Sequence, residues 1–280
     1  MDGLKASYLE IEPAELVHFL LKEGGQYEQD AIAPSDLLTY LNLEFVAFGF
    51  DANLPLEAKP GASGLRALLS FQDRLIAVDD GLKPRQRRFS VLHEIGHYVL
   101  PAHQHSFYLC DSLGMSSWTR LAFEKEANEF AADLLFKGEI FAVDAAGLDI
   151  SVKTVVALAE KYDASFEATA RRLVEKDLRA AMLVVFRNAG GAAQLDADAE
   201  PIWEVRYCVA SAVFKSRFFA RVTGNVPADV AAKLLSPPGR DIKESITCEV
   251  VVSSGREGKL PFRAEFFYNR HNILCLLTPL

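Results

Sequence analysis

Three things that this chain of 280 residues lacks narrow its function before any motif is considered. It has no run of about 18 apolar residues, so the sequence predicts no membrane span. Its N-terminus is acidic and has neither the basic nor the apolar region of a secretory signal peptide. It also lacks a basic excess, because 30 Lys and Arg face 38 Asp and Glu, and this argues against a whole surface that binds nucleic acid.

Cysteine is scarce as well. The four cysteines lie far apart without a C-x-x-C pair, which excludes a cysteine-rich zinc site; they are Cys110, Cys208, Cys248 and Cys275. Such usage is typical of a reducing cytoplasm and not of a disulfide framework, so we expect a cytoplasmic protein. Half of the residues are hydrophobic, which predicts a folded globular chain.

The order of element types predicts an α+β protein of three units. In residues 1–140 we expect helices over 12–22, from Pro34, over 84–100 and over 119–136, with strands at 43–50, 65–71 and 74–80. Residues 53–64 and 101–118 are expected to be irregular. Residues 141–178 hold two short helices that join at 162–165. Residues 179–280 are β-rich, with one helix over 226–236 and a hairpin turn at 269–272.

The stretch HEIGH, residues 93–97, carries the strongest chemical signal. His93 and His97 are four residues apart, so on a helix both imidazoles lie on one face and can share a metal ion. Glu94 is rotated about 100° from His93, where it can reach a metal-bound water and act as general base. Glycine is unfavourable in a helix interior, so the presence of Gly96 makes sense if another element packs closely against the helix there. The pattern predicts a catalytic metal centre.

Zinc in a catalytic site needs a third protein ligand, and the acids of residues 123–135 are the candidates. Glu124 is preferred because it borders the apolar stripe beside Ala127, where small side chains allow another helix to approach. Glu126 stays open as the alternative. His103 lies beyond Pro101 and can also reach the site.

Two further features of a peptidase site are expected near HEIGH. The strand at 74–80 is a candidate edge strand that aligns a substrate by backbone pairing. Candidates for contacting the oxyanion or the substrate are Tyr98, His103, His105 and Arg87, and nothing in the sequence separates them.

The middle unit does not have the charge of a DNA-recognition helix pair. Acidic residues in 149–178 outnumber basic ones; the basic ones are Lys153, Lys161, Arg171, Arg172 and Lys176. This argues against direct DNA binding and favours a role in packing or in docking a substrate.

The motifs RQRRFSVLHEIGHYVL and EKEANEFAADLLF, about thirty residues apart, resemble those of the ImmA/IrrE family of bacterial metallopeptidases. The resemblance implies a zincin-like domain (1–140), a helix-turn-helix-like segment (141–178) and a GAF-like sensor domain (179–280). It implies that His93, His97 and Glu124 hold Zn²⁺, or Mn²⁺ in the cell, with Glu94 as general base. It further implies cleavage of a helix-turn-helix repressor of the DdrO type, which induces DNA-repair genes after radiation or desiccation.

Two other functions are considered beside the peptidase. One is a DNA-binding transcriptional regulator in which the HEIGH metal is structural. The other is a sensor that binds a small molecule or redox signal through residues 179–280 without proteolysis.

Overall fold

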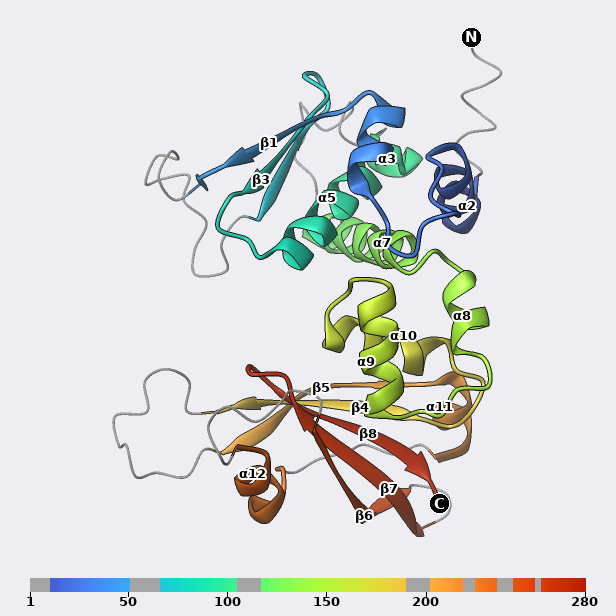
Figure 1. Cartoon of the computed structure of the whole chain (residues 1–280), viewed down its shortest axis with the longest axis vertical. Coiled ribbons are helices and arrows are strands. Elements are labelled where there is room, and N and C mark those ends of the chain that lie inside the picture. Colours follow the sequence, from blue (N-terminus) through green and yellow to red (C-terminus); the bar gives the residue numbers. More distant parts are fainter. Residues whose placement is uncertain are drawn as a thin grey trace. The chain divides into compact units, whose positions relative to one another are not determined.

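The computed structural model describes residues 11–50, 66–104, 117–189, 202–218, 225–235, 244–254 and 258–280. It shows a mixed α+β chain (Figure 1) that divides into two compact units, Met1–Phe141 and Ala142–Leu280. Within the described ranges, no helix combines the length and the apolar character that crossing a bilayer requires.

The helices of the first unit form where the apolar periodicity predicts them. They are α2 (Pro13–Glu23), α3 (Pro34–Leu41), α5 (Pro84–Val99) and α7 (Ser117–Leu135). Three of them begin with proline, whose missing N–H costs nothing in a first turn. α5 ends at Val99, and its C-cap residue Leu100 takes an extended conformation before Pro101. Gly138, with φ of +58°, ends the last turn after α7 and donates from its N–H to the Asp133 carbonyl.

Residues 101–104 form one further helical turn and residues 117–118 begin α7, so the expectation that 101–118 is irregular is wrong at both ends. Residues 105–116 lie outside the described residues. The expected loop at 53–64 lies outside the described residues. The hairpin is confirmed: β2 (Ala67–Ser70) and β3 (Leu75–Asp79) are antiparallel, and Arg74 takes a left-handed φ of 53° as β3 begins.

The prediction that residues 74–80 form an edge strand is wrong. The sheet has the order β1–β3–β2, so β3 is its centre, paired in parallel with β1 (Glu44–Phe48) and antiparallel with β2. Ile76 and Val78 are fully buried as a result. The parallel partner could not be foreseen, because β1 lies far upstream in the sequence. Among the described residues, the edges of this sheet are β1 and β2.

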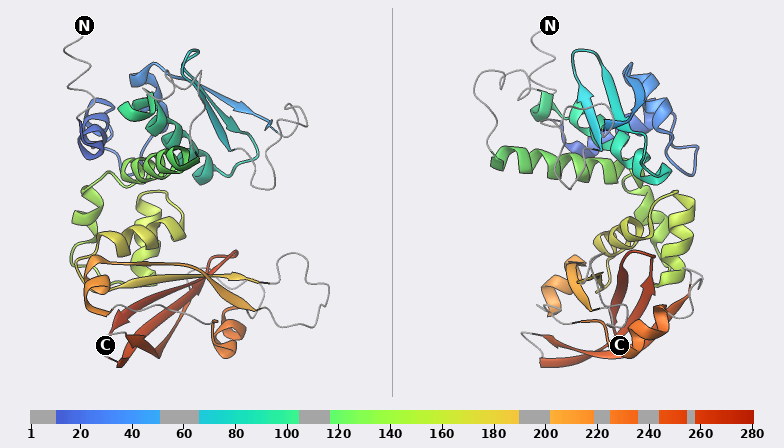
Figure 2. Two further views of the ribbon diagram at one scale, coloured as in Figure 1. Left: turned by 180° about the vertical axis from the view of Figure 1, so that it is seen from behind. Right: turned by 90° about the vertical axis from the view of Figure 1, so that its left-hand side faces the viewer.

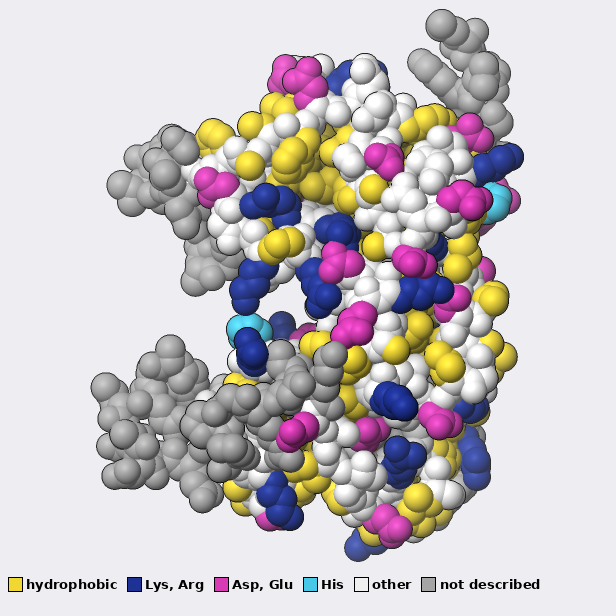
Figure 3. Space-filling view, viewed as in Figure 1, with side chains coloured by type: hydrophobic (Ala, Val, Ile, Leu, Met, Phe, Trp, Pro, Cys, Tyr) yellow, Lys and Arg dark blue, Asp and Glu magenta, His cyan; other side chains and the backbone are white. Residues whose placement is uncertain are grey.

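One face of this small sheet is open. The register places Val46, Ala77 and Leu68 in one row across the three strands, and Val46 and Leu68 keep 38% and 49% of their surface exposed. Figure 3 shows apolar side chains gathered on this part of the first unit. Alternate residues of β3 point to the other face, where α5 packs.

α5 and α7 pack against each other at the position where the sequence has small residues, and Figure 2 shows the two helices side by side. A Cβ on Gly96 would lie 3.3 Å from a Phe130 ring carbon and 3.4 Å from the Ala127 carbonyl oxygen. Ala127 and Ala131 are fully buried. The close approach expected from Gly96 and the alanines is therefore confirmed.

The second unit is built on a five-stranded antiparallel sheet of order β5–β4–β8–β7–β6. The strands are β4 (Met182–Asn188), β5 (Trp203–Ala210), β6 (Ser245–Ser254), β7 (Gly258–Tyr268) and β8 (Ile273–Pro279), as the sequence predicts. Helices α9 (Val152–Lys161) and α10 (Phe166–Lys176) pack on one face. α12 (Ala228–Leu235) packs on the other (Figure 1). Two short helices were not predicted, α8 (Ile140–Ala145) and α11 (Ala212–Phe218).

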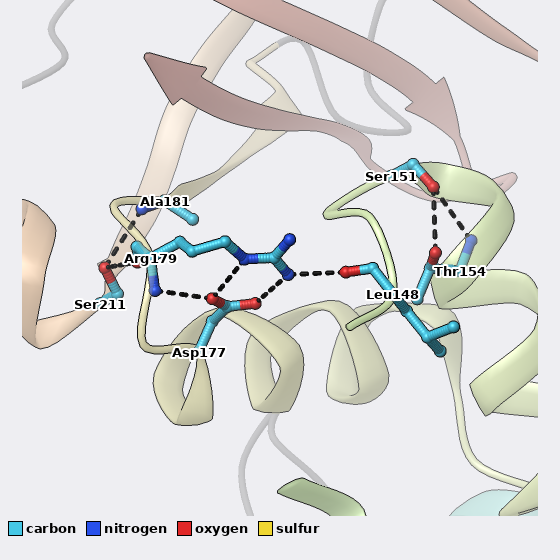
Figure 4. A network of polar contacts seen from close by, with 7 residues as sticks. All are labelled: Leu148, Ser151, Thr154, Asp177, Arg179, Ala181 and Ser211. Carbon is cyan, nitrogen blue, oxygen red and sulfur yellow. Dashed lines mark hydrogen bonds and ion pairs between the residues drawn. The ribbon is translucent and has the colours of Figure 1, made fainter. Parts of the chain in front are cut away.

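Polar contacts join α10, β4 and the start of α9 (Figure 4). Arg179 donates to both carboxylate oxygens of Asp177 and, from Nη2, to the Leu148 carbonyl at 2.7 Å. The fully buried Ser211 hydroxyl donates to the Arg179 carbonyl and accepts from the Ala181 N–H. Helices α9 and α10 fall in the same compact unit as the strands. The domain boundary near 178 stays a prediction.

Candidate metal centre

Three metal-ligating side chains meet where α5 and α7 cross. The Nε2 atoms of His93 and His97 are 3.1 Å apart, as expected for two positions one turn apart on a helix. Glu124, from α7, places one carboxylate oxygen 3.3 Å from His93 Nε2 and the other 3.5 Å from His97 Nε2. Within the described part of the chain, these residues form the one group of three or more His, Cys, Asp and Glu side chains that could hold a metal.

The spacing of these donors fits a small divalent metal. Zinc binds His nitrogen and carboxylate oxygen at about 2.0–2.2 Å in a tetrahedron, which separates neighbouring donors by about 3.3 Å. The two Nε2 atoms are 3.1 Å apart, and each lies 3.3–3.5 Å from a different oxygen of Glu124, so the carboxylate faces the two histidines with both of its oxygens at close to that spacing. Two histidines and one glutamate also leave the fourth position free, as a catalytic zinc site requires.

The electrostatics of the cluster stabilise the ionised form of Glu124 beside the two imidazoles. Hydrogen bonds with His93 and then His97 lower the pKa of Glu124 well below its usual range. Burial by itself would lower the pKa of His93, but the hydrogen bond to Glu124 and the nearby Glu94 charge outweigh it and raise that pKa. Glu124 is thus ionised at neutral pH.

Glu94 sits on α5 between the two histidines and is buried, with 9% of its surface exposed. Desolvation by burial raises the pKa of Glu94, although the neighbouring imidazoles act in the opposite direction. A carboxylate with a raised pKa beside a metal site is a better proton acceptor than an ordinary glutamate. Its position matches the general base expected from the motif.

His103 and Glu126 form a chain of contacts that starts at Nδ1 of His97. His103 Nδ1 is 2.9 Å from His97 Nδ1, and His103 Nε2 is 3.0 Å from a Glu126 carboxylate oxygen. His103 is 3% exposed and stacks on the Phe123 ring, with centroids 4.2 Å apart. Burial lowers the pKa of His103 and so favours its neutral form. Glu126, the alternative third ligand, therefore contacts His103 instead of the metal-facing Nε2 atoms.

The remaining candidates for substrate contact lie elsewhere. The Tyr98 ring stacks on Phe71 and lies under the Arg74 guanidinium at the turn between β2 and β3. Arg87 Nη2 donates to the Asp80 carbonyl at 2.9 Å. His105 lies outside the described residues. None of these placements tests a role in binding the oxyanion, so that role stays a prediction.

The contacts of His103 with His97 and with Glu126 were not predicted from the sequence. Little in the sequence indicates them, because His103 lies two residues after Pro101 and outside the predicted helix. The helical turn at 101–104 brings its ring back over the end of α5.

The first unit is therefore a mixed α+β domain in which two histidines and one glutamate could hold a divalent metal, a ligand set that also occurs in zinc peptidases. Residues 52–174 match the family model of the IrrE N-terminal-like domain of peptidase family M78. The match spans less than half of the chain but includes both motifs, and it supports membership of the ImmA/IrrE family and a metallopeptidase. No curated protein matches the chain.

A solved structure similar to this chain is a Mycobacterium tuberculosis protein described as a transcriptional regulator. It is 15% identical, with a TM-score of 0.59, and the alignment covers 95% of this chain and 75% of that protein. Identity this low shows a common fold alone.

Proposed function

We propose that this chain is a metal-dependent endopeptidase with a narrow protein substrate. His93, His97 and Glu124 hold one Zn²⁺, or Mn²⁺ in the cell, and Glu94 is the general base. The observation that carries the proposal is the convergence of three donor atoms within 4.8 Å of one another beside a buried glutamate. The M78 family match points to the same class of enzyme.

The metal and the side chains of the protein would supply different parts of the chemistry. When bound, the metal polarises the scissile carbonyl and lowers the pKa of its water. Glu94 accepts the water proton and passes it to the leaving amine, a transfer that its raised pKa favours. Glu124 and the two histidines keep the donor geometry fixed, since they come from two helices that touch at Gly96.

The substrate of the proposed peptidase is a helix-turn-helix transcriptional repressor. This step rests on the resemblance to the ImmA/IrrE family, and within it to the Deinococcus protein IrrE. The resemblance also suggests a DdrO-type repressor, whose cleavage would induce the response to radiation and desiccation. Residues 179–280, which resemble a GAF-like sensor domain, are then the place where a small-molecule or redox signal would act.

The sheet of the first unit offers an edge to an extended substrate. β3 is paired on both sides, so the pairing strand we propose is β2, which contacts α5 and which, among the described residues, pairs with β3 alone. The β2–β3 turn also contacts Tyr98, the residue after His97. N-methylation of substrate backbone amides at alternate positions should slow cleavage if the substrate pairs in this way.

The proposal is tested by incubating the purified chain with helix-turn-helix repressors, with Zn²⁺ or Mn²⁺ and with a chelator. We expect one discrete cut that needs metal and is absent in Glu94→Gln. A protein that binds metal but cuts none of these repressors contradicts the peptidase assignment.

A transcriptional regulator with a structural metal is the second candidate, favoured by the name of the M. tuberculosis protein that shares the fold. It predicts salt-sensitive binding to duplex DNA that survives His93→Ala. The acidic excess in 149–178 counts against it.

A further inference from the structure

The two proposed histidine ligands differ in what lies behind them. Nδ1 of His97 meets Nδ1 of His103 at 2.9 Å, and His103 continues to Glu126 at 3.0 Å. Nδ1 of His93 is buried and has no hydrogen-bond partner among the described residues. Hydrogen bonding to the Asn128 side chain does help to raise the pKa of His93. A chain of two further side chains, His103 and then Glu126, is seen behind His97.

The protons of this chain of contacts follow from the metal geometry. Both Nε2 atoms face Glu124, so a metal held there leaves the His97 proton on Nδ1. That N–H must donate to His103 Nδ1, which accepts. His103 then carries its own proton on Nε2 and donates it to the Glu126 carboxylate. Each atom has one role, and no donor faces a donor.

The packing around His103 holds this arrangement in place. His103 is 3% exposed, and the Phe123 ring stacks on it. Phe123 and Glu126 lie three residues apart on α7, so the same helix that supplies Glu124 also clamps His103. Glu126, with 44% of its side chain exposed, is the anionic end of the chain of contacts.

We propose that His103 and Glu126 are positioning residues that fix the tautomer and the ring orientation of His97 for metal binding through Nε2. The inference rests on the metal centre proposed above and deepens it. Histidine ligands commonly donate their second N–H to a carboxylate or carbonyl, and losing that partner typically weakens metal binding about 10–100-fold. Here a buried imidazole is interposed between ligand and carboxylate.

The first test compares zinc dissociation constants, measured by competition with a chromophoric chelator. His103→Phe keeps a ring against Phe123 but cannot accept a hydrogen bond, and Glu126→Gln removes the charge. We expect each to weaken zinc binding about 10–100-fold. Glu129→Gln is the matched control, an exposed glutamate of α7 paired with Lys125, and should leave the constant unchanged.

Two further comparisons separate positioning from a general structural effect. His103→Gln, whose amide both accepts and donates, should recover part of the affinity lost in His103→Phe. In the His103→Phe background, Glu126→Gln should add almost nothing, because the two residues act on His97 as one chain. Additive losses overturn the inference.

The last measurement uses the unaltered, zinc-loaded protein and so does not depend on any variant folding. ¹⁵N NMR should show His97 protonated at Nδ1, with a ¹⁵N–¹⁵N coupling across the bond to His103 Nδ1. A His97 ring protonated at Nε2, or zinc constants of the variants equal to that of the wild type, overturns this inference and leaves the peptidase proposal standing. A wild-type protein that binds no metal overturns both.

Discussion

At the scale of single residues, the role proposed for Glu94 allows metal binding to be measured separately from the cleavage reaction. Glu94→Gln should retain one metal per chain, because His93, His97 and Glu124 are untouched. Its cleavage rate should fall by about 10²–10⁴, the usual contribution of a general base. Metal content by atomic emission, together with cleavage rates, checks this, and cleavage by Glu94→Gln at the wild-type rate would refute the mechanism.

Glu124 and Glu126 share a helix and a chemistry, yet the structure gives them different neighbours. Glu124 faces both Nε2 atoms, whereas Glu126 faces His103. Glu124→Gln should therefore weaken zinc binding more than the roughly 10–100-fold expected of an outer partner such as Glu126. Calorimetric titration of both variants gives the order, and a larger loss in Glu126→Gln would make Glu126 the third ligand.

At the scale of elements, the metal centre depends on how closely α5 and α7 approach. Gly96→Val should lower the free energy of unfolding by about 1–3 kcal/mol, since its added carbons meet Phe130 and the Ala127 carbonyl. It should also weaken metal binding, because Glu124 moves with α7. Denaturant unfolding and zinc titration measure the two effects.

The matched control is Ala122→Val, at an exposed position of α7. It carries the cost of valine in a helix without the clash, so we expect a loss below about 1 kcal/mol. Valine has a higher helix propensity than glycine, so a loss in Gly96→Val no larger than that in Ala122→Val would contradict the close packing at Gly96.

At the scale of the whole molecule, we expect the two compact units to have separate roles. The proposed ligands and Glu94 all lie in Met1–Phe141, and the buried Glu265 of Ala142–Leu280 has a structural task. Its carboxylate accepts from the Val152 N–H at the start of α9 and from the Ser245 hydroxyl. It therefore joins α9 to the sheet.

Glu265→Leu should lower the free energy of unfolding by about 1–3 kcal/mol, because two donors lose their buried acceptor. Zinc affinity at 25 °C should stay unchanged, since the proposed ligands His93, His97 and Glu124 all lie in the other unit. Glu249→Leu, at an exposed site on β6, is the control and should change stability by less than about 0.5 kcal/mol. A weaker zinc affinity in Glu265→Leu would contradict the separation of tasks.

Much of this protein can be predicted from local sequence, because helices and strands depend on periodicity and on the residues at their ends. Pro84, the apolar spacing of α5 and Pro101 determine a helix that presents His93 and His97 on one face. The alternating strands of the second unit and the turn at 269–272 follow in the same way. The short helices α8 and α11 were missed, since helices of six and seven residues have little room for a period.

Contacts between distant segments were decided by the tertiary structure alone. The sequence left Glu124 and Glu126 open, because both lie on the same helix and only the packing of α7 on α5 turns one toward the histidines and the other toward His103. The parallel pairing of β1 with β3, which makes β3 central, is equally non-local. The sequence by itself determined one helix that carries two candidate ligands and a candidate base. The third donor and the support behind His97 depend on which side chains meet across helices, and local patterns do not encode that.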